Sequence, residues 1–222
     1  VIEPDETPCS FVLAAMRIVE EVVVELGELL QIFDLNITSE LVDDAGRKFG
    51  LGSSAAVTVA TVRALYAHYG LDLSRMEQLK LALLACIEVQ RSGSGGDIAA
   101  SMFGGWIAYT SFDREWARTE RANRSLVELL QMDWPGLSVR RVAPPDGLRL
   151  LVGWTGSPAS TSRLVGGVQS RKAKGRMDYP QFLTESSRCV EALVKALNDG
   201  DREGTLAGIR RNRELLRQLG ER

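Results

Sequence analysis

Residues 48–57 have the sequence KFGLGSSAAV. Its two glycines permit tight backbone turns and let a ligand approach the main chain closely. The helix predicted for about 55–68 offers unpaired N–H groups and a partial positive charge at its start. Small side chains at 52–56 leave those amides open, which suits an anion such as a phosphate. The stretch therefore predicts a phosphate-binding turn.

Other interpretations of this stretch stay open. It can be a glycine turn with a serine N-cap, because the hydroxyl of Ser53 or Ser54 can cap the helix as well as bind magnesium. A Walker P-loop is excluded, because Gly-x-x-x-x-Gly-Lys-Ser/Thr is absent from the sequence. The dinucleotide form Gly-x-Gly-x-x-Ala does match, with Asp72 about twenty residues further on. However, no convincing hydrophobic strand ends at Lys48-Phe49, so a nicotinamide-dependent oxidoreductase is the weaker hypothesis.

A second loop of small residues, SGSGGD at 92–97, ends in a carboxylate. Asp97 precedes a helix predicted for 98–103, where it can serve simply as the N-cap. Its functional interpretation is a general base, or a charge that orients an acceptor oxygen. Amides at a helix start keep a carboxylate ionised, which fits either role.

A third loop, WTGSPASTS at 154–162, follows a predicted strand and is rich in hydroxyl side chains. Such a loop can hydrogen-bond a polar ligand, or it can be an ordinary capped turn from strand to helix. The basic residues Lys48 and those within 171–176 are usually solvated charges. They matter for function only if they converge on the same pocket.

Composition bounds the function class. The 222 residues carry a net charge of −2, which argues against a general binder of nucleic acid or of a membrane surface. The odd, widely spaced cysteines Cys9, Cys86 and Cys189 predict reduced core thiols in a cytoplasmic protein. His68 is expected to be structural or solvated. Neither a long apolar run nor a signal pattern is present in the sequence.

Hydrophobic periodicity predicts alternating helices and short strands, with a linker at Pro144–Gly147 that separates domains 1–146 and 147–222. The strands are predicted at Phe33–Ile37, Trp106–Tyr109 and Leu148–Trp154. Besides the two helices above, helices are predicted at about 8–32, 74–89, 125–131, 163–170, 179–198 and 201–219.

Together the three loops resemble those of the GHMP kinases. Within that superfamily the chain is most similar to bacterial phosphomevalonate kinases, from about Phe11 to Asn212. The segments that carry this resemblance are residues 48–57, 93–101, 105–109, 111–113 and 152–160. The resemblance implies an α+β, two-lobed GHMP kinase fold. Its N-terminal lobe would resemble domain 2 of ribosomal protein S5, and its C-terminal lobe would be ferredoxin-like.

The activity that the resemblance implies is transfer of the γ-phosphoryl group of ATP to (R)-5-phosphomevalonate, giving 5-diphosphomevalonate and ADP in the mevalonate pathway of isoprenoid biosynthesis. ATP with Mg²⁺ and the acceptor are the implied partners, without nucleic acid or membrane. The alternatives are mevalonate kinase, another GHMP kinase with a hydroxyl acceptor, or an inactive nucleotide-binding fragment. Because a phosphate acceptor is already largely ionised near neutral pH, alignment rather than proton removal is expected.

The resemblance also implies roles for individual residues. Asp97 would sit at the transfer site, and Lys48 would neutralise phosphate charge where donor and acceptor meet. Ser54 would bind magnesium. The residues that would cradle the ATP phosphates are Gly50, Leu51, Gly52, Ser53, Ser54 and Ala55. Those that would hold the acceptor are Ser94, Gly95, Gly96, Ser157, Ser160 and Ser162.

The sequence departs from the family pattern at three places. Family members carry an N-terminal strand segment with a lysine, and a third glycine-rich motif near the C-terminus, and neither has a counterpart here. The chain is therefore expected to be incomplete at both ends. Mevalonate kinases place a metal-binding glutamate eleven residues before the aspartate, where this chain has Cys86. Glu88 would lie on another side of the helix, so the sequence assigns it no metal role.

Overall fold

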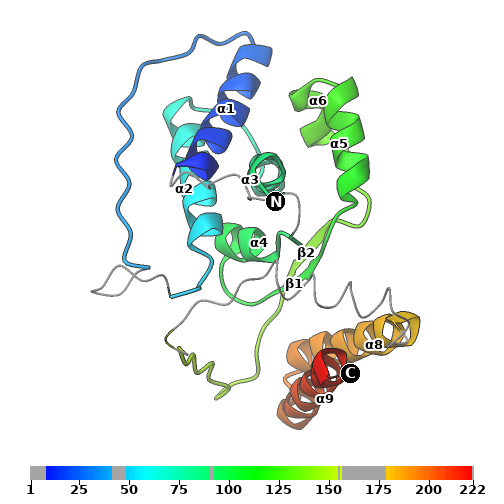
Figure 1. The fold of residues 1–222 in the computed structure, drawn as a ribbon. Coiled ribbons are helices and arrows are strands. Elements are labelled where there is room, and N and C mark those ends of the chain that lie inside the picture. The colour runs from blue at the N-terminus through cyan, green and yellow to red at the C-terminus, as the bar shows by residue number, and fades with distance from the viewer. Residues whose placement is uncertain (1–8, 42–48, 91–92, 155, 157–178, 222) are drawn as a thin grey trace. The chain divides into compact units, whose positions relative to one another are not determined.

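The computed structural model describes residues 9–41, 49–90, 93–154, 156 and 179–221. The chain forms two compact units, Val1–Arg140 and Arg141–Arg222 (Figure 1). The predicted domains, 1–146 and 147–222, stay a prediction.

Three helices build the core of the first unit, and a fourth lies across two of them. They are α1 (Ser10–Glu25), α2 (Ser53–His68), α3 (Arg75–Val89) and α4 (Gly96–Phe103). Helix α1 packs against α2 and α3, and α4 packs against α2 and α3 from another side (Figure 1). Apolar residues at helical spacing explain this arrangement, since Ile18, Val19, Val22 and Val23 of α1 are almost fully buried.

Helix α1 is shorter than the predicted helix over 8–32. It ends because Gly27 adopts a φ of 79° and donates its N–H to the carbonyl of Val24, while Glu28 donates to Val23. This pair of bonds is the Schellman arrangement, which a glycine in the left-handed region makes at little cost. The apolar residues beyond Gly27 therefore leave the helix.

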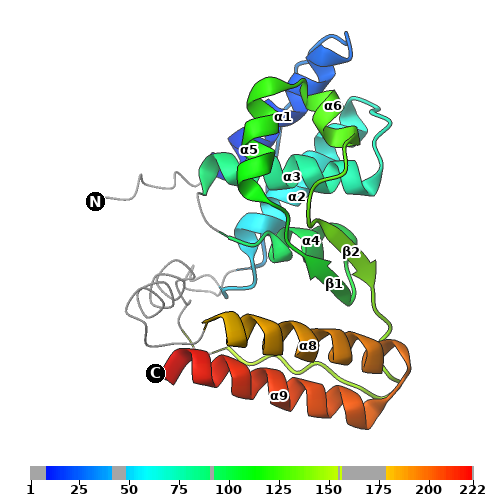
Figure 2. The ribbon, with the colours of Figure 1, turned by 90° about the vertical axis from the view of Figure 1, so that its right-hand side faces the viewer.

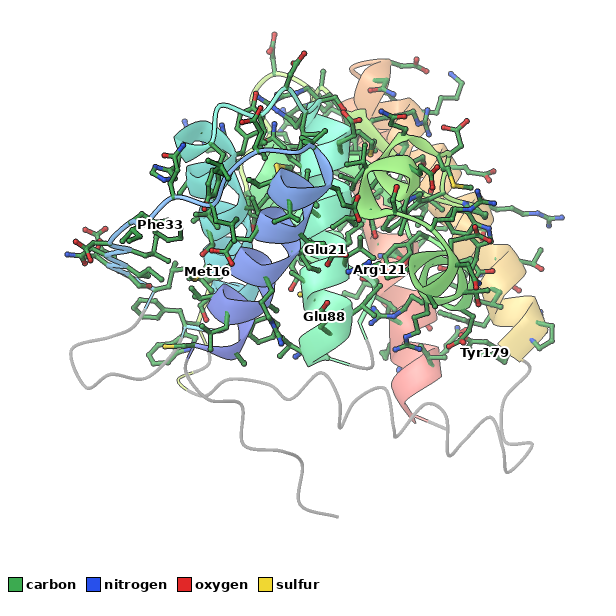
Figure 3. The ribbon with its side chains drawn as sticks, turned by 90° about the horizontal axis from the view of Figure 1, so that it is seen from above. Met16, Glu21, Phe33, Glu88, Arg121 and Tyr179 are labelled. Atoms are coloured by element: carbon green, nitrogen blue, oxygen red, sulfur yellow. The ribbon has the colours of Figure 1, made fainter. Side chains whose placement is uncertain are left out.

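The strand predicted for Phe33–Ile37 is wrong. Residues 28–40 form no helix or strand, and Leu29, Leu30, Ile32, Leu35 and Ile37 are exposed. An alternating pattern makes a strand only where another backbone pairs with it. No such partner lies among the residues that the structure describes. Phe33 is the anchor of this segment, with its ring 5.3 Å from that of His68 (Figure 3).

The middle of the chain contains two elements that the sequence analysis missed. They are α5 (Arg114–Asn123) and β2 (Ser138–Arg141), which pairs with β1 (Ile107–Thr110) in a two-stranded sheet (Figure 2). Both lie in charged sequence with little apolar periodicity. The predicted strand Trp106–Tyr109 is confirmed by β1. The helices predicted for 74–89 and 125–131 are confirmed by α3 and by α6 (Leu126–Gln131), which begin after the caps Ser74 and Ser125.

Carboxylates of α1 hold α5 and α6. Glu25 accepts hydrogen bonds of 2.8 Å from the backbone N–H groups of both Leu126 and Val127, and so caps the start of α6. One turn earlier, Glu21 forms an ion pair with Arg121 of α5 (Figure 3). These contacts join segments about a hundred residues apart in the sequence.

Lys80 of α3 is buried, with only 6% of its surface exposed. Its ammonium donates hydrogen bonds of 2.7 Å to the carbonyls of Leu130 and Met132, at the end of α6. The indole of Trp134 lies beside it, 5.9 Å from Nζ to the ring centroid. Burial lowers the pKa of Lys80, while Glu77 and Asp133 act in the opposite direction. A buried cation is tolerated here because two carbonyls accept from it.

The second unit contains α8 (Tyr179–Asn198) and α9 (Arg202–Glu221), packed side by side. Asp201 begins α9, because its carboxylate accepts from the N–H of Gly204. The helices predicted for 179–198 and 201–219 are confirmed. The strand predicted for Leu148–Trp154 is wrong, since these residues pair with no other strand in the described structure.

Two expectations from composition are tested by the described residues. Cys9, Cys86 and Cys189 are free thiols, as expected, but Cys9 is exposed, so it is not a core residue. None of the helices that the structure describes combines the length and apolarity needed to cross a bilayer.

Replacing Lys80 with methionine tests its role in holding the end of α6. Lys80→Met keeps the length of the side chain but leaves the carbonyls of Leu130 and Met132 without their charged donor. We expect the free energy of unfolding to fall by about 2 kcal/mol. Urea denaturation followed by tryptophan fluorescence measures this, because Trp134 lies beside Lys80.

The matched control is Arg118→Met, which removes a more exposed cation paired with Glu115 on α5. A surface pair of this kind contributes about 0–1 kcal/mol, so the urea midpoint should move little. Equal midpoints for Lys80→Met and Arg118→Met would contradict the role of Lys80.

Candidate functional site

The start of α2 follows a glycine turn. Gly50 and Gly52 adopt φ values of 75° and 77°, and Gly52 is the N-cap of the helix. Ser53 and Ser54 are therefore the first two helical residues, and no side chain caps this end. The serine N-cap interpretation is thus wrong. The first hydrogen bond within the helix runs from the N–H of Ala56 to the carbonyl of Gly52, at 2.9 Å. The three preceding amides face out of the helix start.

The start of α4 repeats this design. Gly95 is the N-cap with a φ of 77°, and again no side chain caps the helix. Asp97 is the second helical residue, so its N-cap interpretation is also wrong. Its carboxylate is exposed and accepts one hydrogen bond of 3.0 Å from the N–H of Ile98. The helix start is thus left with a carboxylate directed to solvent.

The two helix starts meet. A Cβ atom added to Gly52 would lie 3.6 Å from the Cβ atom of Asp97. Helices α2 and α4 pack against each other, so this proximity follows from their contact in the core. The glycine turn and the aspartate, 45 positions apart in the sequence, therefore border the same place on the surface of the first unit.

Gly95 is required by its neighbours, and Gly96 lies in close contact with its own. A methyl group on Gly95 would collide with Cδ2 of Leu83 and would lie 3.1 Å from the hydroxyl of Tyr109. One on Gly96 would lie 3.4 Å from Oγ of Ser94 and 3.6 Å from the ring of Tyr109. The ring of Tyr109 thus lies against the peptides that precede Asp97.

The electrostatics of the site favour an anion bound together with a cation. Two helix starts present partial positive charge, and Asp97 adds a negative charge beside them. The described residues include no group of three or more metal-binding side chains. In proteins, Mg²⁺ is often bound by one or two side chains together with the phosphates of a nucleotide.

The structure brings together ten of the site residues predicted from the sequence and leaves four outside the described residues. Lys48, Ser157, Ser160 and Ser162 are those four. The loop before α2 and its first turn contain Gly50, Leu51, Gly52, Ser53, Ser54 and Ala55, and the loop before α4 and its first turn contain Ser94, Gly95, Gly96 and Asp97.

Sequence reasoning missed three residues that contact the loop before α4. Tyr109, Ser111 and Arg114 all donate hydrogen bonds to backbone carbonyls of that loop. One signal was present in the sequence, because Tyr109 and Ser111 are two positions apart and so share a face of an extended chain. Arg114 lies at the start of a helix that the pattern did not predict.

The dinucleotide interpretation loses its structural context. Asp72 lies in the short connection between α2 and α3. In a Rossmann fold, the acidic residue that binds the ribose follows a strand instead. The residues just before it, from Ser53 to Gly70, form α2 and its terminal turn.

Replacing Gly95 with alanine tests the close packing of the α4 start. Gly95→Ala combines a positive φ with a collision against Leu83, so we expect the free energy of unfolding to fall by about 2–4 kcal/mol. Gly70→Ala is the matched control, because Gly70 has a φ of 62° but nothing within 4 Å of an added Cβ. Its cost should be about 1 kcal/mol. Similar losses in thermal or urea denaturation would contradict the packing described.

Known proteins are similar to this chain in both sequence and fold. Residues 10–105 match the family model described as GHMP kinases N terminal domain. A phosphomevalonate kinase of Streptomyces sp. strain CL190 is 42% identical over 100% of this chain and 60% of its own length. A mevalonate kinase of Thermococcus sibiricus is 31% identical over 98% of this chain and 58% of its own length.

Solved structures agree with these relatives. A Lin0012 protein from Listeria innocua superposes with a TM-score of 0.92 at 37% identity, covering 99% of this chain and 61% of that one. The phosphomevalonate kinase of Streptococcus pneumoniae, in complex with phosphomevalonate and AMPPNP, superposes with a TM-score of 0.84 at 30% identity, covering 99% and 64%. The chain thus spans about 60% of the length of each of these four proteins.

Proposed function

We propose that this chain, which belongs to the GHMP kinase family, works in the complete protein as a phosphomevalonate kinase. The reaction is transfer of the γ-phosphoryl group of ATP to (R)-5-phosphomevalonate, with 5-diphosphomevalonate and ADP as products. The proposal rests on one observation: a Cβ atom added at Gly52 would lie 3.6 Å from the Cβ atom of Asp97. A helix start that can bind an anion therefore lies beside a carboxylate. The 42% identity to the Streptomyces phosphomevalonate kinase supports this acceptor.

The turn before α2 would bind the triphosphate of ATP. The amides of Ser53, Ser54 and Ala55 lie ahead of the first bond within the helix and can donate to phosphate oxygens. Gly50 and Gly52 let the phosphates approach the backbone, because neither carries a side chain. Lys48, just before the turn, would neutralise phosphate charge.

The side chains present fit a magnesium ion that is held mainly by phosphates. Ser54 would supply a hydroxyl ligand from the first turn of α2. When bound, Mg²⁺ neutralises charge on the phosphates during transfer. The Cβ atom of Asp97 lies 3.6 Å from a Cβ atom added at Gly52, two positions before Ser54, so a carboxylate borders the start of α2.

Asp97 would align the acceptor rather than deprotonate it. A phosphate monoester is already largely ionised near neutral pH, so its attacking oxygen needs no strong base. The barrier to phosphoryl transfer is mostly charge and alignment. A carboxylate fixed by the Ile98 amide at a helix start can orient the metal and the acceptor.

The acceptor would lie against the start of α4. The hydroxyl of Ser94 accepts a hydrogen bond of 3.3 Å from the N–H of Gly96, and both lie in the loop and first turn that carry Asp97. Ser157, Ser160 and Ser162 would complete this side. We also propose a cytoplasmic location. Cys9, Cys86 and Cys189 are free thiols, and the cytoplasm both keeps thiols reduced and supplies ATP.

Mevalonate kinase is the second candidate, since the Thermococcus enzyme is 31% identical. Cys86 stands against it. This residue lies on α3 where the resemblance places a metal-binding glutamate in mevalonate kinases. A thiol is a poor ligand for magnesium, which prefers oxygen. Glu88 is not assigned that role, because it lies about 200° around the helix from Cys86; its side chain pairs with Arg17 at 3.4 Å.

An assay of acceptors decides between the candidates. The complete protein is supplied with Mg²⁺ and ATP, together with phosphomevalonate or mevalonate, and ADP release is coupled to NADH oxidation. We expect turnover with phosphomevalonate and no turnover with mevalonate alone. Turnover of mevalonate would refute the proposed acceptor. Magnesium-dependent ATP binding without transfer to either would favour a nucleotide-binding protein without kinase activity.

Removing the charge of Asp97 should lower turnover far more than nucleotide affinity. We expect Asp97→Asn to reduce kcat by about 100-fold or more, with KM for ATP changed less than about threefold. Steady-state kinetics at saturating phosphomevalonate measures both. Asp72→Asn is the matched control, because Asp72 is an exposed aspartate between α2 and α3. An unchanged kcat for Asp97→Asn would mean that this carboxylate has no part in transfer.

Removing the hydroxyl of Ser54 should weaken the response to magnesium. We expect Ser54→Ala to raise the Mg²⁺ concentration for half-maximal rate by about tenfold. Ser53→Ala is the control, since Ser53 precedes it in the same turn and carries the same hydroxyl. A magnesium titration of ATP turnover separates them. If Ser53→Ala shows the larger shift, the metal ligand is Ser53 rather than Ser54.

A further inference from the structure

Ser94, the residue just before the α4 cap, has a carbonyl that receives two side-chain hydrogen bonds. The hydroxyl of Tyr109 donates to it at 2.6 Å, and the hydroxyl of Ser111 donates at 2.9 Å. Both donors come from β1 and the residues just after it. A carbonyl oxygen has two lone pairs, so both are used here by side chains.

Arg114 fixes the same loop at two more carbonyls. Its guanidinium donates to Gly93 at 2.5 Å and to Gln90, the C-cap of α3, at 3.0 Å. A guanidinium fork of this kind also meets the negative end of the α3 dipole. The loop that leads from α3 to Asp97 is therefore held by four hydrogen bonds from one side.

The donors themselves are rigidly supported. Asp113 donates its N–H to the carbonyl of Pro135 at 2.9 Å, and its carboxylate caps α5 by accepting from Trp116. Phe112 is buried, with its ring 5.2 Å from that of Trp134. A Cβ atom on Gly136 would lie only 2.8 Å from the carbonyl oxygen of Ser111, so the two backbones touch. The hydroxyls of Tyr109 and Ser111 are therefore held in place, and the Ser94 carbonyl that they bind is held with them.

We propose that Tyr109 and Ser111 are positioning residues for the transfer reaction, which set the place of Asp97 by fixing the carbonyl of Ser94. The inference rests on the proposed function, because it assumes that Asp97 and Ser94 act on the acceptor. Neither positioning residue needs to touch the substrates. They act through the two-residue span from Ser94 to the start of α4, where the Tyr109 ring also lies against Gly96.

The hydroxyl of Tyr109 remains a donor over the usual assay range. Burial raises its pKa above the ordinary value of 10.0, and the nearby Asp97 carboxylate raises it further, while Ser111 and Arg114 oppose the shift. The raised pKa keeps the protonated form below pH 10, so the hydrogen bond to Ser94 persists there.

A double-mutant cycle in the complete protein tests the proposal. Tyr109→Phe and Ser111→Ala each leave one donor on the Ser94 carbonyl, so each should lower kcat by about threefold at most. The double variant leaves that carbonyl without a side-chain donor, and we expect kcat to fall by about tenfold or more beyond the product of the single effects. KM for ATP should stay within about threefold, because the turn before α2 is unaffected.

A structural control and a rescue variant accompany the cycle. Tyr69→Phe combined with Thr119→Val also removes two hydroxyl-to-carbonyl bonds, to Gln31 and Glu115, in the same unit. This control should leave kcat unchanged. Tyr109→Phe combined with Ser111→Thr restores a hydroxyl at an exposed position, and its kcat should return to that of Tyr109→Phe alone.

A second measurement is independent of activity. Hydrogen exchange of the peptide covering residues 93–103 should be faster in the double variant than in the wild type and the control. Unchanged exchange would refute the fixing of the loop. Faster exchange with unchanged kcat would refute the positioning role.

The outcome with the wild type separates this inference from the proposed function. If the wild type phosphorylates mevalonate instead, the proposed acceptor is wrong, and the cycle measured with mevalonate still decides the role of Tyr109 and Ser111. If the wild type phosphorylates neither acceptor, both proposals are overturned.

Discussion

The close approach of two helix starts is the constraint on which the first unit depends. Helices α2 and α4 meet near their positive ends, where Gly52 and Gly95 are the N-caps and the Gly52 position lies close to Asp97. Two like dipole ends repel each other, and a nearby carboxylate and bound anions offset that repulsion. Asp97 supplies the carboxylate from within the structure. This geometry therefore favours a negatively charged ligand at the two helix starts.

The rest of the unit maintains this approach through a continuous series of contacts. Lys80 of α3 donates to the carbonyl of Leu130 at the end of α6. Trp134, which follows α6, donates its indole N–H to the carbonyl of Leu129 at 2.9 Å. Trp134 packs on Phe112, and the following turn holds Asp113 through Pro135. The neighbouring hydroxyls reach Ser94, just before α4. The buried lysine and the loop that carries Asp97 thus belong to one connected body, in which core packing fixes the position of exposed groups.

The sequence predicted the elements whose signals are local. Glycines with small neighbours marked the turns before α2 and α4, and Ser74 with Glu77 forms the capping box of α3. What it could not predict depends on partners distant in the chain. Phe33–Ile37 alternates like a strand but has no paired backbone in the described structure. The meeting of Gly52 with Asp97 arises from helix packing across 45 positions, and the resemblance to a family, not the pattern, indicated it. Ser53 or Ser54 and Asp97 were expected as N-caps because serine and aspartate are favoured there. The glycines before them occupy the cap positions instead.

The central claim is that the amides at the start of α2 and the carboxylate of Asp97 face one place, where the donor and acceptor phosphates meet. A crystal structure of the complete protein with magnesium, AMPPNP and phosphomevalonate tests this claim most directly. The account predicts the triphosphate on the backbone amides of residues 52–56, with its terminal phosphate between them and Asp97. A triphosphate bound elsewhere, with Asp97 directed away from its terminal phosphate, would contradict it.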